Sequence, residues 1–190
     1  MLKQVLIATV FSSTFLFQSF IVNKDNRKHH HTSLNEDDYL PWNNYRRLTW
    51  DDFKGDTPPQ TDDAALTTTY VGFSYSKTGN TINYNIECKF QKSRSWGRVK
   101  TEYILKHEQG HFDIAEIFAR KLNKEVKEYL SKSRNHEGLN PIYTKLMNEK
   151  REMQEDYDIE TNHSINKAKQ AEWNEKIEEM LNELQPSGDY

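Results

Sequence analysis

Apolar and polar residues alternate in two stretches of the chain, from residue 67 to 75 and from residue 82 to 90. The apolar or β-branched positions are Thr67, Thr69, Val71, Phe73 and Tyr75 in the first stretch and Ile82, Tyr84, Ile86, Cys88 and Phe90 in the second. A period of two is typical of strands that bury one face. The turn residues Thr78, Gly79 and Asn80 lie between them, so the pattern predicts a β-hairpin.

After Gly97 the apolar period becomes helical. Residues recur at spacings of three, four or their sums at Tyr103, Ile104, His107, His111, Ile114, Phe118, Leu122, Val126 and Leu130. This predicts one long amphipathic helix. Asn140 and Pro141 suit the start of a second helix running to about Leu184, in which a kink would not be unusual. The predicted fold class is α+β, a small antiparallel sheet packed on a pair of long antiparallel helices.

The N-terminal segment has the pattern of an export signal, because Lys3 precedes an apolar stretch that ends at Val22. No small-x-small cleavage site follows, so residues 1–22 are expected to be either a signal peptide or an N-terminal anchor. Residues 23–45 are polar and are interpreted as a linker. The folded, metal-binding domain is expected over residues 46–186. Export would place it in the periplasm, outside the cell, or on a membrane through an uncleaved N-terminal segment.

Composition and charge exclude several classes of function. The 190 residues are 35% hydrophobic and 29% charged, a balance that suits one domain with a modest core. A formal net charge of -3 offers no general attraction for nucleic acid, which is not expected as a partner. Cys88 is the only cysteine. An intramolecular disulfide and an all-cysteine zinc site are therefore excluded, and nitrogen and oxygen must hold any metal.

The segment His107-Glu108-Gln109-Gly110-His111 carries the clearest chemical signal. Residues four apart on a helix project from nearly one face, so the two histidines can share one metal ion. A catalytic Zn2+ takes neutral imidazoles and a third protein ligand, and leaves a position for water, whose proton Glu108 could accept. The sequence thus predicts a zinc metallopeptidase of the HExxH type, acting on peptide or protein substrates. The alternatives are a zinc-stabilised binding module without catalysis and a metal-free helical adaptor.

The third ligand must come from outside this motif. His163 is favoured, because an antiparallel second helix would bring its region back beside the motif. Glu160, three residues earlier on almost the same face, is the alternative ligand or an acceptor for that imidazole. His136 falls in the expected inter-helix turn, far from the site. Glu116 is expected to point elsewhere and to form a surface pair with Arg120.

Three blocks of sequence resemble domain-of-unknown-function family 922, bacterial proteins described as secreted zinc-dependent proteases. Residues 107–116 are similar to its metal motif, residues 48–55 to its N-terminal signature, and residues 157–163 to its C-terminal one. The resemblance implies a zinc site with His163 as an added ligand candidate, in an exported bacterial protein whose substrate is not established. Ser164 stands where the family pattern has glycine. The sequence does not indicate the oligomeric state.

Overall fold

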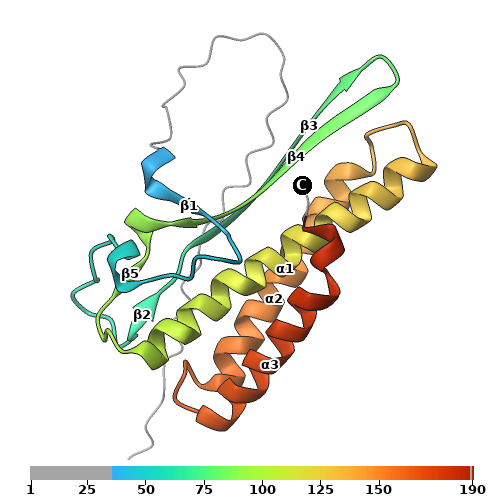
Figure 1. Cartoon of the computed structure of the whole chain (residues 1–190). Helices are drawn as coiled ribbons and strands as arrows, with labels where there is room; N and C mark the ends of the chain where they lie inside the picture. The colour runs from blue at the N-terminus through green and yellow to red at the C-terminus, as the bar shows by residue number, and fades with distance from the viewer. Residues whose placement is uncertain (1–35, 189) are drawn as a thin grey trace, which may run out of the picture.

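The computed structural model describes residues 36–188 and 190. Its elements are η1 (Glu36–Asp38), β1 (Tyr39–Pro41), η2 (Trp50–Asp52), β2 (Ala65–Leu66), β3 (Thr69–Thr78), β4 (Thr81–Gln91), η3 (Lys92–Arg94), β5 (Trp96–Gly97), α1 (Glu102–Lys132), α2 (Leu139–Thr161), α3 (Lys167–Glu183) and η4 (Gln185–Ser187). Helix α1 lies between the sheet and the helices α2 and α3 (Figure 1). The α+β class with a small antiparallel sheet is confirmed.

The predicted hairpin is present as β3 and β4, paired without interruption from Thr69–Phe90 to Thr78–Thr81. Gly79 in the turn has a φ of +61°, a left-handed conformation that glycine adopts without steric cost. Strand β1 pairs antiparallel with β4 and completes a sheet of order β1-β4-β3. The ordered sheet therefore begins within the expected linker, before residue 46.

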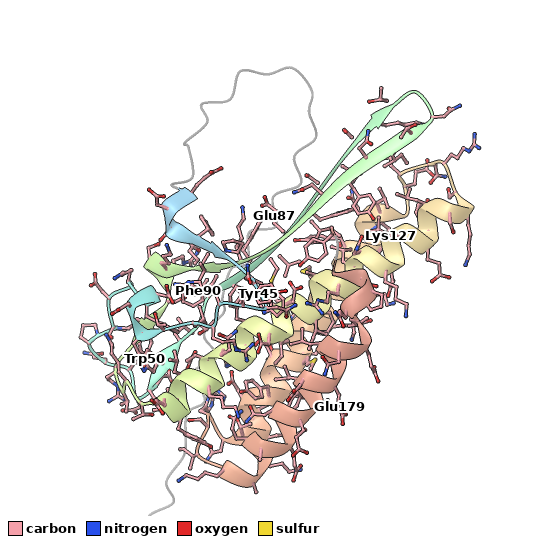
Figure 2. All side chains as sticks on the ribbon, viewed as in Figure 1. Tyr45, Trp50, Glu87, Phe90, Lys127 and Glu179 are labelled. Atoms are coloured by element: carbon pink, nitrogen blue, oxygen red, sulfur yellow. The ribbon has the colours of Figure 1, made fainter. Side chains whose placement is uncertain are left out.

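Helix α1 matches the helical period of the sequence and begins at an N-cap, Thr101, whose side chain accepts a hydrogen bond from the Ile104 amide. Residues 112–120 are buried without interruption, because the sheet covers one side of the helix and α2 and α3 cover the other. Figure 2 labels Phe90 of β4, whose ring centroid lies 5.9 Å from that of Phe112 in α1. A helix buried all round must pair every polar side chain it carries.

The expected pair of long helices is corrected to three helices, because the second one breaks after Thr161. Asn162, His163 and Ser164 have φ values of +48°, +50° and +72°, which no α-helix can continue through. Helix α3 then begins at a new N-cap, Asn166, whose side chain accepts from the Lys169 amide. The region expected to form one helix therefore forms two, α2 and α3, and both pack against α1.

The expected signal peptide or anchor, residues 1–22, lies outside the residues that the structure describes. Within residues 36–188, none of the helices has the length and apolar character needed to span a membrane.

Glu116 and Arg120 do form the expected pair, at 2.8 Å, but it is buried and not on the surface. Their side chains are only 3% and 5% exposed. Burial raises the pKa of Glu116, while hydrogen bonds from Tyr190 and Arg120 oppose that shift. The Tyr190 hydroxyl donates to Glu116 at 2.6 Å, and Arg120 donates to the Leu181 carbonyl at 2.7 Å. The pair therefore fastens the C-terminal segment to α1.

Removing one partner of this buried pair should be costly. We expect Arg120→Met to lower the free energy of unfolding by about 3 kcal/mol or more, because the Glu116 carboxylate loses its buried partner. The matched control is Lys132→Met, which breaks an ion pair of the same i,i+4 spacing with Glu128 whose side chains are 72% and 61% exposed. That change should leave the free energy of unfolding nearly unchanged, because water screens the exposed pair. Urea unfolding of both variants measures the difference, and equal losses would contradict the buried arrangement.

Candidate metal centre

Three side chains from α1 and α2 converge on one point. The His107 Nε2 lies 3.3 Å from the His111 Nε2 and 3.2 Å from the Asp158 Oδ1. The His111 Nε2 lies 3.0 Å from the same oxygen. Within residues 36–188 and 190, this is the group of histidine, cysteine and acidic side chains close enough to hold a metal ion. The two histidines share a face of α1, as their spacing predicts.

The spacing of these three atoms fits a zinc ion. Zinc bonds nitrogen and oxygen at about 2.0–2.2 Å in tetrahedral sites, which places neighbouring ligand atoms about 3.3–3.5 Å apart. The observed separations of 3.0–3.3 Å are close to that range. Two imidazoles and a carboxylate are also a donor set that zinc takes. The residues present therefore fit a bound Zn2+.

Glutamine side chains fix the role of one nitrogen in each imidazole. The His107 Nδ1 lies 2.7 Å from the Gln170 Oε1, and the His111 Nδ1 contacts the Gln154 Oε1. An amide oxygen only accepts, so each Nδ1 donates and each Nε2 is the ring nitrogen left to bind a proton or a metal ion. The Gln170 amide nitrogen donates to the Tyr157 hydroxyl at 2.6 Å, which fixes the orientation of that amide. Outer contacts of this kind orient histidine ligands in metal sites.

The cluster consequently gathers electron-rich atoms and attracts positive charge. Burial alone would lower the pKa of His111, but the adjacent Asp158 carboxylate raises it to about 9. Burial would raise the pKa of Asp158, but His111 and His107 hold it well below its usual range. A proton or a metal cation satisfies the same electrostatic demand.

Tyr157 packs the two imidazoles into position. Its ring is stacked on that of His107, with centroids 4.6 Å apart, and meets the His111 ring edge-on at 5.0 Å. The tyrosine is fully buried, and its hydroxyl donates to the His107 carbonyl at 3.2 Å. A Cβ at position 110 would collide with that hydroxyl, which explains glycine within the motif. Tyr157 therefore holds both imidazoles in position through its ring and binds the α1 backbone through its hydroxyl.

Glu108 lies beside the cluster and is 4% exposed. Burial raises the pKa of its carboxyl, and the opposing influences are His111, His107 and the Thr67 hydroxyl. Thr67 Oγ1 lies near the carboxyl without hydrogen-bond geometry, and within the described residues it is the buried side-chain oxygen that lacks a partner. A carboxyl with a raised pKa close to both imidazoles is suited to accept and return a proton.

Gln109 and Asp113 of α1 bind the segment of residues 42–48, which precedes η2. The Gln109 Oε1 accepts from the Leu48 amide at 2.7 Å, and its amide nitrogen donates to Asp113 at 2.9 Å. Asp113 also accepts from the Trp42 indole at 2.9 Å and pairs with Arg47 at 2.9 Å. These contacts hold residues 42–48 against Gln109 and Asp113 of α1. They connect the start of the sequence block 48–55 to the block 107–116, which gives a structural reason for the two blocks to occur together.

The other candidate ligands lie outside the cluster. The His163 Nδ1 is 3.8 Å from the Asp158 Oδ1, and its side chain is 68% exposed. Glu160 instead accepts a hydrogen bond from the Trp173 indole at 3.0 Å. His136 lies in the expected turn between α1 and α2, where its ring is tilted against that of Tyr75 with the centroids 5.7 Å apart.

Asp158 takes the third place in the cluster, which the sequence had led us to expect for His163 or Glu160. We expected a histidine or a glutamate there and not an aspartate. One signal was available, since Asp158 lies inside the block 157–163 that resembles a family signature.

The turn after α2 is strained and firmly held. A non-glycine residue in the left-handed region costs on the order of 1–2 kcal/mol, and Asn162, His163 and Ser164 adopt it in succession. The His163 amide donates to the Asp158 carbonyl at 2.9 Å, and Tyr103 of α1 donates to the Ser164 carbonyl at 2.7 Å. Ser164 has a φ of +72°, a conformation best suited to glycine, which is the residue that the resemblance led us to expect there.

Comparison with known proteins gives a family and no activity. Residues 47–164 match the family described as "Bacterial protein of unknown function (DUF922)". The matched segment contains the whole cluster and ends at Ser164. No curated protein and no solved structure matches the chain.

The ligand set can be tested with two isosteric changes in α2. We expect Asp158→Asn to weaken Zn2+ binding at least about a hundredfold, because it removes a charged ligand, and Glu160→Gln to change it less than about tenfold. Both variants belong in a background with alanine at residues 29–31, so that this histidine tract binds no metal. Competition with a chromophoric chelator measures the affinities. A larger loss for Glu160→Gln would assign the third ligand to Glu160.

Zinc binding should also depend on pH with a defined sign. His111 has a pKa raised to about 9 in the metal-free cluster, so a proton must leave before the ion binds. The affinity for Zn2+ should therefore rise about tenfold per pH unit from pH 7 and level off above about pH 9. Calorimetry in buffers of different ionisation enthalpy would count the released protons. An affinity that stays constant between pH 7 and 9 would contradict this description of His111.

Proposed function

Because this chain belongs to the DUF922 family, whose description assigns no function, we propose from its site that it is a zinc-dependent hydrolase of peptide (amide) bonds. The observation that carries the proposal is the position of Glu108, a buried carboxyl with a raised pKa beside the cluster of His107, His111 and Asp158. A site that only binds a metal has no need of this additional carboxyl.

His107, His111 and Asp158 would hold the ion through Nε2, Nε2 and Oδ1. When bound, Zn2+ supplies a Lewis acid that polarises a carbonyl group and acidifies water. Glu108 accepts a proton from the water whose oxygen adds to the carbonyl carbon. It then delivers a proton to the amine nitrogen as the carbon–nitrogen bond breaks. A carboxyl whose pKa burial raises above its ordinary value is better able both to accept and to return a proton.

The number of ligands favours catalysis over a purely structural ion. Structural zinc sites close with four protein ligands, whereas catalytic sites use three and leave a place for water or substrate. Among the described residues the cluster has three members. The unpartnered Thr67 hydroxyl near Glu108 also supports a polar ligand on that side. The zinc-stabilised binding module is the second candidate. The measurement of peptide cleavage described below separates it from the hydrolase.

Export of the protein stays part of the proposal. The pattern that predicts it lies in residues 1–22, and an exported hydrolase would meet peptides or proteins outside the cytoplasm. These partners follow from the proposed amide chemistry.

The role of Glu108 can be isolated with Glu108→Gln. We expect this variant to bind Zn2+ within about threefold of the wild type and to lose at least about a hundredfold in kcat/KM, because the amide cannot accept the proton. The matched control is Glu128→Gln, an exposed position of the same helix. A library of quenched-fluorescence peptides measures cleavage. A zinc-loaded wild type that cleaves no peptide would favour the binding module, and an active Glu108→Gln would remove Glu108 as the base.

A further inference from the structure

The cluster opens to solvent on the side where α2 ends. The exposed fraction of the side chain rises from 5% for His107 and 14% for His111 to 31% for Asp158. It reaches 68% for His163, which follows Asp158 by five residues. The cluster is therefore accessible to solvent on the side of Asp158 and His163 and closed on the buried face of α1.

His163 lies near the cluster without belonging to it. Its Nδ1 is 3.8 Å from the Asp158 Oδ1, the same oxygen that faces both histidines. That distance is too long for a hydrogen bond, so the imidazole is not committed to the carboxylate. A polar atom placed beside Asp158 from the solvent side would be within reach of this nitrogen.

The backbone holds this exposed side chain in place at a cost. His163 occupies the middle of the left-handed tripeptide and has a φ of +50°. Its amide is bonded to the Asp158 carbonyl, and the next carbonyl is bonded to Tyr103 of α1. A solvated histidine needs no such conformation, and strained backbone of this kind concentrates at functional sites. The backbone that carries the imidazole is thus fixed relative to both helices that build the cluster.

We propose that His163 is a catalytic residue on the substrate side, donating an imidazole N–H to the carbonyl oxygen of the scissile amide as negative charge develops there. This inference rests on the proposed hydrolase function and deepens it. It assigns His163 to the substrate and not to the metal, in contrast to the expectation from the sequence. The ligand set remains His107, His111 and Asp158.

Three variants of the full chain separate these roles. His163→Gly removes the imidazole and accepts the positive φ without strain, whereas His163→Asn keeps an N–H donor in a residue that tolerates this conformation. Asn162→Gly is the matched control, because it makes the same backbone change next to His163 and leaves the imidazole. The urea midpoints verify that all three fold.

We expect Zn2+ affinity within about threefold of the wild type for all three variants, measured by chelator competition. The kcat/KM of His163→Gly should fall about a hundredfold to a thousandfold with little change in KM, as loss of a donor to the developing oxyanion does. His163→Asn should recover at least about tenfold of that loss, and Asn162→Gly should retain activity.

Binding of acetohydroxamate to the zinc-loaded protein supplies a readout that needs no turnover. His163→Gly should weaken it about tenfold, and His163→Asn should not. A tenfold or greater loss of Zn2+ affinity in His163→Gly would make His163 a ligand, and equality with the wild type in both activity and acetohydroxamate binding would overturn its catalytic role. Failure of the hydrolase proposal looks different, since the wild type itself would then cleave no peptide. In that case equal acetohydroxamate binding by wild type and His163→Gly would still reject a role for His163.

Discussion

The central interaction of the structure is the close approach of the Nε2 atoms of His107 and His111 to the Asp158 carboxylate, which requires positive charge between them. These atoms face each other at 3.0–3.3 Å between two packed helices. Gln170 and Gln154 accept from the opposite ring nitrogens, so the imidazoles cannot turn to relieve the crowding. Only positive charge between the three atoms makes the arrangement favourable. A proton on His111 or a metal cation supplies that charge, and Glu108 places a further buried carboxyl beside it.

The fold brings these three side chains together by placing α1 in the centre of the molecule, packed against α2. A helix covered by the sheet on one side and by α2 and α3 on the other keeps its polar residues from water, so each is held by a partner. Gln109 and Asp113 hold the N-terminal segment, and Glu116 and Arg120 hold the C-terminal one. The candidate metal cluster thus lies in a helix whose following turns contact residues 42–48 on one side and the C-terminal residues on the other.

The sequence predicts the elements with a regular period and misses the break in that period. The hairpin and α1 follow from alternation and helical spacing, and His107, Glu108 and His111 follow from their places on one helix. Nothing comparable marks the end of α2, because residues 142–185 contain neither glycine nor proline. Three left-handed non-glycine residues in succession are held there by tertiary hydrogen bonds, including that from Tyr103. Asp158 was missed for the same reason, since its approach to the histidines depends on how α2 packs against α1.

The most direct test of this account is a crystal structure of the full chain grown with Zn2+, with anomalous diffraction recorded on either side of the zinc absorption edge. We expect one strong anomalous peak bonded to the Nε2 atoms of His107 and His111 and to Asp158 at about 2.0–2.2 Å, with each Nδ1 still donating to its glutamine. A peak bonded through a Nδ1 atom, a peak only at the histidines of residues 29–31, or an empty cluster at saturating zinc would contradict it.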